Sequence, residues 1–152
     1  MIDLRVTKLF FDKPKVIRAV NRAKKGGLSR AGGWIRKTAR QSMRVRKGSS
    51  PPGQPPYAHT RLLKDFLFYS WDQRTESVVI GPAKLHRRRR GRRSTVPNLL
   101  EFGGSTRRPD YWRGAKKKMH IAPRPYMGPA LQKADQAGVL MDAWRNSVRG
   151  GP

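Results

Sequence analysis

The chain has 152 residues, and its 35 Lys and Arg residues against 9 Asp and Glu residues give a net charge of +26. This excess of cations predicts a polyanionic neighbour: nucleic acid is the first candidate, an acidic protein surface the second and an anionic membrane the third. The length suits one domain with a modest core, and the absence of cysteine excludes disulfides, thiolate metal sites and thiol nucleophiles.

The N-terminal part is predicted to be an arm followed by one long helix. Residues 1–12 show an imperfect alternation of apolar and polar side chains, which is typical of a short strand or arm. Over residues 13–47 apolar side chains recur at helical spacing, and basic residues cover the rest of the surface. Glycine pairs at 26–27 and 32–33 allow either a helix start near Ser29 or the close approach of another backbone. We favour a single helix with a weak point.

The middle of the chain is predicted to be a loop followed by a hairpin. Residues 48–60 contain four prolines, which fix φ and remove amide donors, so this segment predicts an extended loop. Residues 61–82 combine an aromatic and apolar run, a polar turn and a β-branched run, which predicts an antiparallel hairpin. We expect the aromatic hairpin, residues 66–80, to supply the core sheet.

The C-terminal half is predicted to alternate basic loops with regular elements. Residues 83–94 form an arginine-rich run without an apolar period, which is typical of a loop. Residues 95–104 predict a short helix that Gly103 ends, residues 105–118 a second basic loop, and residues 119–149 a strand and one amphipathic C-terminal helix.

These elements predict an α+β fold in a single domain over residues 1–152. In this fold a long N-terminal helix and a C-terminal helix pack on a small antiparallel sheet, and long basic loops project from the body.

Patterns for catalysis or metal binding are absent from the sequence. The three histidines lie far apart, and the acidic residues form no close pair of the kind that holds Mg²⁺. The glycine-rich segment 26–33 lacks the residue order of a phosphate-binding P-loop. We therefore expect no enzyme activity, no cofactor and no metal. A small phage nuclease or maturation enzyme would require a metal-dependent activity that is lost on changing Glu101 or Asp110.

Two basic segments, 84–93 and 105–118, are predicted to contact DNA or an acidic partner. Tyr111 and Trp112 lie in the second segment, where they can stack on bases or anchor the loop. Solvated loops without a partner are the alternative for both segments. The cations expected to make the contact are Arg87, Arg88, Arg89, Arg90, Arg92, Arg93, Arg107, Arg108, Arg113, Lys116, Lys117 and Lys118.

Four segments occur in an informative order. They are SPPGQPPYAHTRLLKDF, VVIGP, LLEFGG at 99–104 and APRPYMGPALQKA from residue 122. This order resembles the tail-completion or neck-type minor tail proteins of long-tailed bacteriophages, in which motifs written yLEfGT and PFmrPAl hold the last two places. The resemblance covers about residues 49–134. The chain departs from the pattern at Gly104, where Thr is common, and in the arginine-rich insertion.

The last two landmarks contain residues that either build the monomer or also form a subunit contact. Glu101 is expected to accept backbone amide hydrogens or to pair with an arginine, and Gly103 to adopt a positive φ. The prolines are expected to stiffen the start of the final helix. The residues in question are Leu100, Glu101, Phe102, Gly103, Pro125, Tyr126, Met127 and Pro129.

The resemblance implies a virion structural protein at the head–tail junction, assembled in the host cytoplasm as a ring expected to hold six copies. The ring would join head-closure or adaptor proteins to tail-terminator or tail-tube proteins around a channel for double-stranded DNA. We expect a soluble protein without membrane contact, because no apolar run reaches the ~18–20 residues of a spanning helix. The alternative is a free-standing basic nucleic-acid-binding protein of ribosomal or nucleoid type.

Overall fold

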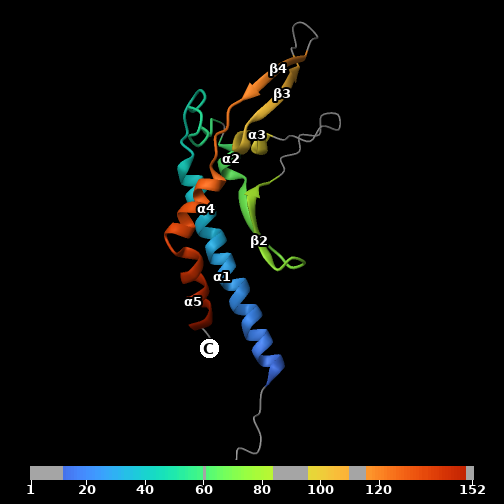
Figure 1. The fold of residues 1–152 in the computed structure, drawn as a ribbon, viewed down its shortest axis with the longest axis vertical. Helices are drawn as coiled ribbons and strands as arrows, with labels where there is room; N and C mark the ends of the chain where they lie inside the picture. Colours follow the sequence, from blue (N-terminus) through green and yellow to red (C-terminus); the bar gives the residue numbers. More distant parts are fainter. Residues whose placement is uncertain (1–11, 60, 84–95, 110–115, 150–152) are drawn as a thin grey trace, which may run out of the picture.

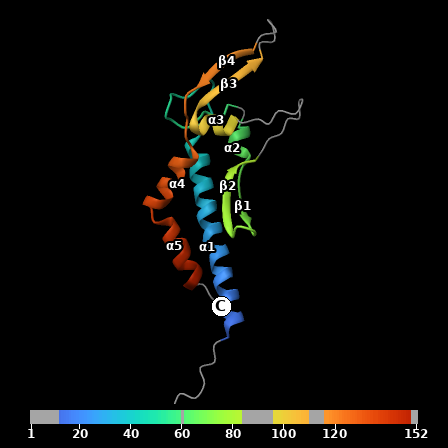
Figure 2. The same cartoon turned by 45° about the vertical axis from the view of Figure 1, so that its right-hand side comes forward.

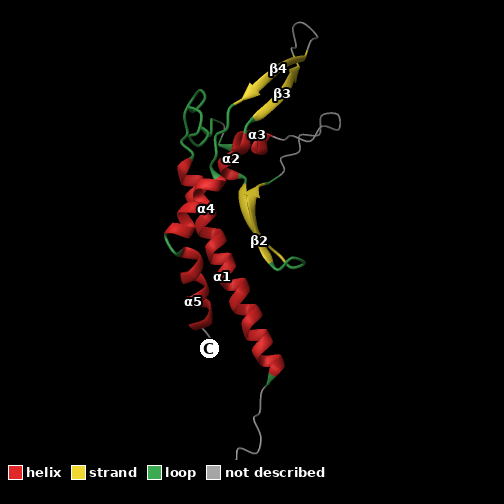
Figure 3. Ribbon diagram, in the orientation of Figure 1, coloured by secondary structure: helices red, strands yellow, loops and turns green. Residues whose placement is uncertain are grey.

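The fold is known from a computed structural model that describes residues 12–59, 61–83, 96–109 and 116–149, with the backbone alone for 106–109, 116–117 and 146–149. Five helices and two antiparallel hairpins make an α+β fold, as predicted (Figures 1 and 3). The elements are α1 (Lys13–Ser42), α2 (Leu62–Asp65), β1 (Leu67–Asp72), β2 (Ser77–Pro82), α3 (Val96–Phe102), β3 (Gly104–Pro109), β4 (Lys116–Ile121), α4 (Met127–Gln136) and α5 (Val139–Arg149).

The long helix α1 forms the axis of the molecule (Figure 1). It begins where the Oδ1 atom of Asp12 accepts a hydrogen bond from the Lys15 amide at 3.0 Å, with Pro14 in the first turn, where no helical partner for its nitrogen is needed. The helix then continues for 30 residues, about 45 Å at 1.5 Å per residue, through both glycine pairs. The prediction of a single helix is confirmed.

The helix α1 ends at Ser42, five residues before the predicted end at 47. Met43 adopts an extended backbone, with φ −81° and ψ 117°. Its carbonyl accepts a hydrogen bond from Nζ of Lys64, and the carbonyl of Arg44 accepts one from the Ala58 amide at 2.9 Å. These tertiary hydrogen bonds replace the last predicted helical turn.

The hairpin of β1 and β2 runs in register from Leu67 opposite Pro82 to Asp72 opposite Ser77. At its turn, the Asp72 carboxylate accepts hydrogen bonds from the Thr75 hydroxyl at 2.8 Å and from the Arg74 amide at 3.0 Å. These bonds, the Thr75 bond first, lower the pKa of Asp72 below its ordinary value. The turn is therefore fixed by local side-chain chemistry, as its polar sequence suggests.

The hairpin packs on the glycine-containing part of α1. A Cβ atom at Gly32 would lie only 2.7 Å from Cγ1 of Val78 and 3.3 Å from the Tyr69 ring. At Gly33 a Cβ would lie 3.8 Å from the same ring. The glycines thus permit a close approach, as one of the two expectations had it, but the groups that approach are side chains rather than backbone.

The helices α4 and α5 run back along α1 on the side opposite to the β1–β2 hairpin, so α1 lies between the hairpin and the C-terminal helices (Figures 1 and 2). Ala130 and Ala134 of α4 and Ala143 of α5 are buried. The prediction of one helix at the end of 119–149 is wrong, because Gly138, with φ +65°, separates two helices. A left-handed glycine of this kind ends a helix.

The core lies where α1, β1 and the start of α4 meet. Its largest fully buried side chains are those of Tyr126, Met43 and Leu67, and smaller residues complete it: Ile35, Ala39, Ala58, Ala130 and Ala134. Within the aromatic hairpin, residues 66–80, Leu67 is the only fully buried residue. The hairpin therefore adds one deep side chain to the core and leaves much of its aromatic surface exposed.

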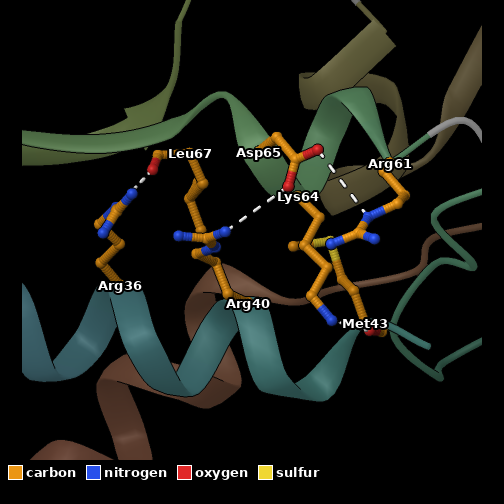
Figure 4. Close-up of polar contacts among 7 residues, drawn as sticks. All are labelled: Arg36, Arg40, Met43, Arg61, Lys64, Asp65 and Leu67. Atoms are coloured by element: carbon orange, nitrogen blue, oxygen red, sulfur yellow. Dashed lines mark hydrogen bonds and ion pairs between the residues drawn. The ribbon is translucent and has the colours of Figure 1, made fainter. Parts of the chain in front are cut away.

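Polar contacts hold α2 and the start of β1 against α1 (Figure 4). Arg36 donates from Nε to the Leu67 carbonyl, and Nη2 of Arg40 lies 3.5 Å from Oδ1 of Asp65. The other carboxylate oxygen of Asp65 lies 3.9 Å from Nε of Arg61. Two arginines of α1 are thereby used inside the monomer.

The segment 105–118 is not the loop that was predicted. It contains most of β3 and the start of β4, which pair antiparallel from Gly104 opposite Ile121 to Pro109 opposite Lys116. The sequence shows no apolar alternation here because Lys118, Met119 and His120 of β4 are all exposed rather than packed on a core. The hairpin extends away from the helices at one end of the molecule (Figures 1 and 2).

Candidate functional site

The carboxylate of Glu101 joins the segments LLEFGG and APRPYMGPAL. It extends from α3 to the start of α4, where Oε2 accepts hydrogen bonds from the amides of Tyr126 at 2.9 Å and Met127 at 3.1 Å. Oε1 accepts a third from the Gly128 amide at 2.8 Å. First-turn amides have no partner within their own helix, and a negative charge is favourable there. Glu101 therefore caps α4 from another helix.

Tyr126, whose amide donates to Glu101, is buried in the core, with 1% of its surface exposed. Burial raises the pKa of its phenol to about 12, and the nearby charge of Glu101 adds to the effect. Leu100 and Met127, on either side of the contact, pack against the same core cluster. The start of α4 is thus fixed by apolar packing and by hydrogen bonds together.

Gly103 makes the sharp change of direction between α3 and β3. Its φ is +72°, and its amide donates to the Leu99 carbonyl at 2.9 Å, closing the helix. A Cβ atom at this position would lie 3.0 Å from the Ile121 carbonyl oxygen and 3.0 Å from Cδ of Pro123. Both the backbone angle and the available space therefore require glycine.

Arg124 is a residue of this site that the sequence reasoning missed. Its amide donates to the Leu100 carbonyl at 2.6 Å, its Nε to the Ser50 carbonyl at 2.8 Å and its Nη1 to the Ala122 carbonyl at 3.1 Å. It thereby ties the Pro/Gly-rich loop to both landmark segments. The available signal was a single arginine between two prolines. We call residues 99–104 and 122–128 the α3–α4 joint.

An open groove of about 520 Å³ lies beside the joint. We call it the apolar groove, since most of its wall consists of apolar side chains from α1, β2, α3 and α4. At its rim Phe102 is 79% exposed and Leu131 is 51% exposed. Its main apolar lining residues are Ile35, Val78, Ile80, Phe102, Met127 and Leu131.

The predicted motif residues lie together at the joint, but their surroundings differ. Tyr126 lies in the core, Leu100 packs against it, and Glu101 and Gly103 make the joint itself. Phe102 and Met127 line the apolar groove. The half-buried Pro125 and Pro129 flank the start of α4.

The predicted cationic contact residues are only partly within the described residues. Those of the arginine-rich run, Arg87, Arg88, Arg89, Arg90, Arg92 and Arg93, lie outside them, as does Arg113. The others lie on the β3–β4 hairpin, where Arg107 is opposite Lys118 and Arg108 is opposite Lys117, with Lys116 at the end of the ladder. Lys118 is exposed.

Two other kinds of site are absent from the described residues. They contain no group of three or more His, Asp or Glu residues arranged to hold a metal ion. None of the helices in this part of the chain is long and apolar enough to cross a bilayer.

Comparison of the chain with models of known protein families, with curated proteins and with solved structures found no match. We therefore infer function from the order of the landmarks and from the geometry of the joint and the apolar groove.

Proposed function

We propose that the chain is a structural protein of a phage virion, acting at the head–tail junction as one subunit of a ring. The order of its four landmark segments supports this proposal. So does the physical link between the last two, since LLEFGG supplies the carboxylate and APRPYMGPAL supplies the amides that it binds. In this chain the two motifs therefore complete each other.

The observation that carries the proposal is the apolar surface beside the joint. Phe102 is 79% exposed at the rim of a groove of about 520 Å³. The residues on either side of Phe102 are held by hydrogen bonds, Glu101 to the amides of α4 and the Gly103 amide to the Leu99 carbonyl. Apolar hollows rimmed by exposed large side chains are typical of protein–protein contacts. The groove and Phe102 form the contact with the neighbouring subunit of the ring.

The net charge of the chain determines the salt conditions under which subunits can associate into rings. A net charge of +26 opposes association of free chains, and the ion pairs among the described residues involve few of the cations. Apolar contact must therefore overcome repulsion until acidic neighbouring rings, or DNA in the channel, offset the charge. Rings of the isolated protein are expected to form more completely as added salt screens the repulsion.

The mass of the purified protein in solution tests the proposal. We expect closed rings by light scattering and negative-stain microscopy at about 150 and 500 mM salt, with more rings at the higher concentration. Changing both Phe102 and Leu131 to Ser should leave a folded monomer. Val45 and Val79 are matched controls, because they are 53% and 59% exposed and lie outside the groove. Their change to Ser should leave the rings intact.

Other outcomes would favour the other functions. A wild-type chain that stays monomeric at every salt concentration and binds nucleic acid with a steep salt dependence would support the free-standing nucleic-acid-binding protein. A metal-dependent hydrolysis lost on changing Glu101 would support the enzyme. Either result contradicts the ring.

A further inference from the structure

Most of the cationic side chains of α1 have no acceptor among the described residues of the monomer. Its 30 residues include ten Lys or Arg and no Asp or Glu. Three of the ten contact acceptors in the monomer: Lys24 pairs with Glu76, Arg36 donates to the Leu67 carbonyl, and Arg40 pairs with Asp65. All three acceptors belong to α2 or to the β1–β2 hairpin, which cover only part of α1.

Four of the remaining cations form a straight row. Lys15, Arg18, Arg22 and Lys25 are spaced by three, four and three residues, which places them on one face of a helix. The row spans about 15 Å at 1.5 Å per residue. All four residues are exposed, and among the described residues their side chains have neither an ion-pair nor a hydrogen-bond partner. We call this row the cationic stripe.

Three residues of the cationic stripe, Lys15, Arg18 and Arg22, lie on the part of α1 that projects beyond the hairpin, and Lys25 lies level with the hairpin turn. The contact of Lys24 with Glu76 marks the level of the hairpin turn. Figures 1 and 2 both show the N-terminal end of α1 continuing past this turn without an element beside it on the hairpin side. Among the described residues, no element on the hairpin side therefore blocks a long straight anion from Lys15, Arg18 and Arg22.

The opposite face of the same helical segment is apolar but small. Val16, Ile17 and Val20 are exposed there, which makes residues 13–25 amphipathic. Basic amphipathic helices also bind anionic membranes, usually with aromatic or leucine side chains inserted among the acyl chains. This segment has neither aromatic nor leucine residues. Its charge is therefore better suited to a polyanion that stays in water.

We propose that the cationic stripe binds the phosphate backbone of double-stranded DNA. Four cations along about 15 Å give one positive charge per roughly 4–5 Å, which is close to the spacing of about 3.4 Å of axis between charges on one strand of a duplex. Contacts of this kind position a duplex and do not read its sequence. The inference names the DNA-binding element of the ring proposed above and rests on that function only for its biological setting.

The salt dependence of DNA binding by the full chain tests this inference. A labelled duplex of about 30 base pairs is titrated, between about 50 and 200 mM salt, with wild type and with the variant K15Q/R18Q/R22Q/K25Q. Each lost phosphate contact reduces the slope of log affinity against log salt by about 0.9, so the slope should fall by about 3 to 4. At physiological salt the variant should bind roughly 100- to 1,000-fold more weakly.

A second variant with the same charge change is the control. Lys37, Arg44, Arg46 and Lys47 are exposed and lie outside the stripe, and their change to Gln should reduce the slope by less than about 1. Equal losses in the two variants would overturn the proposal, because binding would then follow net charge alone. Binding to phosphatidylserine vesicles that V16S/I17S/V20S abolishes, with DNA binding unaffected by the stripe variant, would overturn it in favour of a membrane.

The particle size of each variant separates this inference from the proposed function. The stripe variant should keep the circular dichroism spectrum and the ring of the wild type while losing DNA affinity. If the wild type forms no ring but its DNA binding still depends on the stripe, the ring proposal fails and the DNA site stands. If rings form and the stripe variant binds DNA as tightly as the wild type, the DNA site fails.

Discussion

At the scale of single residues, the α3–α4 joint depends on a few groups that each meet several needs. One carboxylate, that of Glu101, satisfies three amides, and one guanidinium, that of Arg124, reaches two carbonyls besides the one its amide binds. Substitutions here should therefore cost more than their partial exposure suggests, because each leaves more than one backbone group without its partner.

Replacing Glu101 with Gln should lower the free energy of unfolding by about 1–3 kcal/mol, because it removes the charge and one of the two acceptor oxygens facing the amides. Urea denaturation followed by circular dichroism measures the change. Asp135→Asn is the control, since it alters the net charge equally on an exposed position of α4. A loss no larger than that of the control would contradict the capping role.

Gly103→Ala should be destabilising by about 2 kcal/mol or more, since a positive φ and a crowded Cβ position act together. Gly53→Ala separates the two causes, because Gly53 has φ +78° but no atom within 4 Å of its Cβ position. We expect it to cost about 1 kcal/mol in the same denaturation measurement. Equal costs at the two positions would show that the contacts with Ile121 and Pro123 are unimportant.

Tyr126 should make the fold sensitive to alkaline pH. The folded-state pKa of about 12 lies above the ordinary value of 10.0, so the stabilisation by the neutral phenol is complete below pH 10.0 and is lost as the pH rises through about 12. A titration of phenolate absorbance should show a late phase that Tyr126→Phe removes. Tyr57→Phe should retain that phase, and its loss there would refute the assignment.

Sequence reasoning at this scale succeeded where the requirement was local. The positive φ of Gly103 follows from its place after a short helix, and Glu101 as an amide acceptor follows from an acid in an apolar segment. The sequence does not identify which amides donate to Glu101, since they lie 25 or more residues further along the chain. Arg124 was missed for the same reason, because its partner Ser50 is 74 residues away.

At the scale of elements, the glycines of α1 differ in how closely other groups approach them. Gly32 lies under the hairpin side chains of Val78 and Tyr69, whereas the Cβ position of Gly26 has only the far end of Arg30, at 4.0 Å, nearby. The hydrophobic pattern predicted the helix and its buried face, but it contained no information on which glycine the hairpin covers.

Gly26→Ala should therefore stabilise the protein by about 0.5–1 kcal/mol, as expected for a helix-interior position where a Cβ atom meets no crowding. Gly32→Ala should instead destabilise it, because the gain in helix propensity is smaller than the cost of displacing Val78. Thermal denaturation of the two variants compares them within one helix. Stabilisation by both changes would mean that the hairpin does not rest on α1 at Gly32.

The β3–β4 hairpin marks the limit of prediction at this scale. Periodicity finds strands that bury one face, and in this hairpin the consecutive residues Lys118, Met119 and His120 of β4 are all exposed. The β1–β2 hairpin was found because its aromatic and β-branched runs face α1 in part. The division of the C-terminal helix required the backbone angle of Gly138, which a glycine in the sequence allows but does not demand.

At the scale of the whole molecule, two surfaces with different chemistry lie on one elongated body. The apolar groove and Phe102 lie beside the joint, and the cationic stripe lies at the projecting end of α1. We infer that the first contacts neighbouring subunits and the second contacts DNA. Composition alone predicted the need for a polyanion, but neither surface could be located before the fold placed α1 between the hairpin and the C-terminal helices.

A cryo-EM reconstruction of the assembled protein tests the central claim most directly. We predict a closed ring in which Phe102 and the apolar groove are buried against the adjacent subunit, with the α3–α4 joint unchanged from the monomer. An assembly in which Phe102 and the groove face solvent, while other surfaces hold the subunits together, would contradict the account.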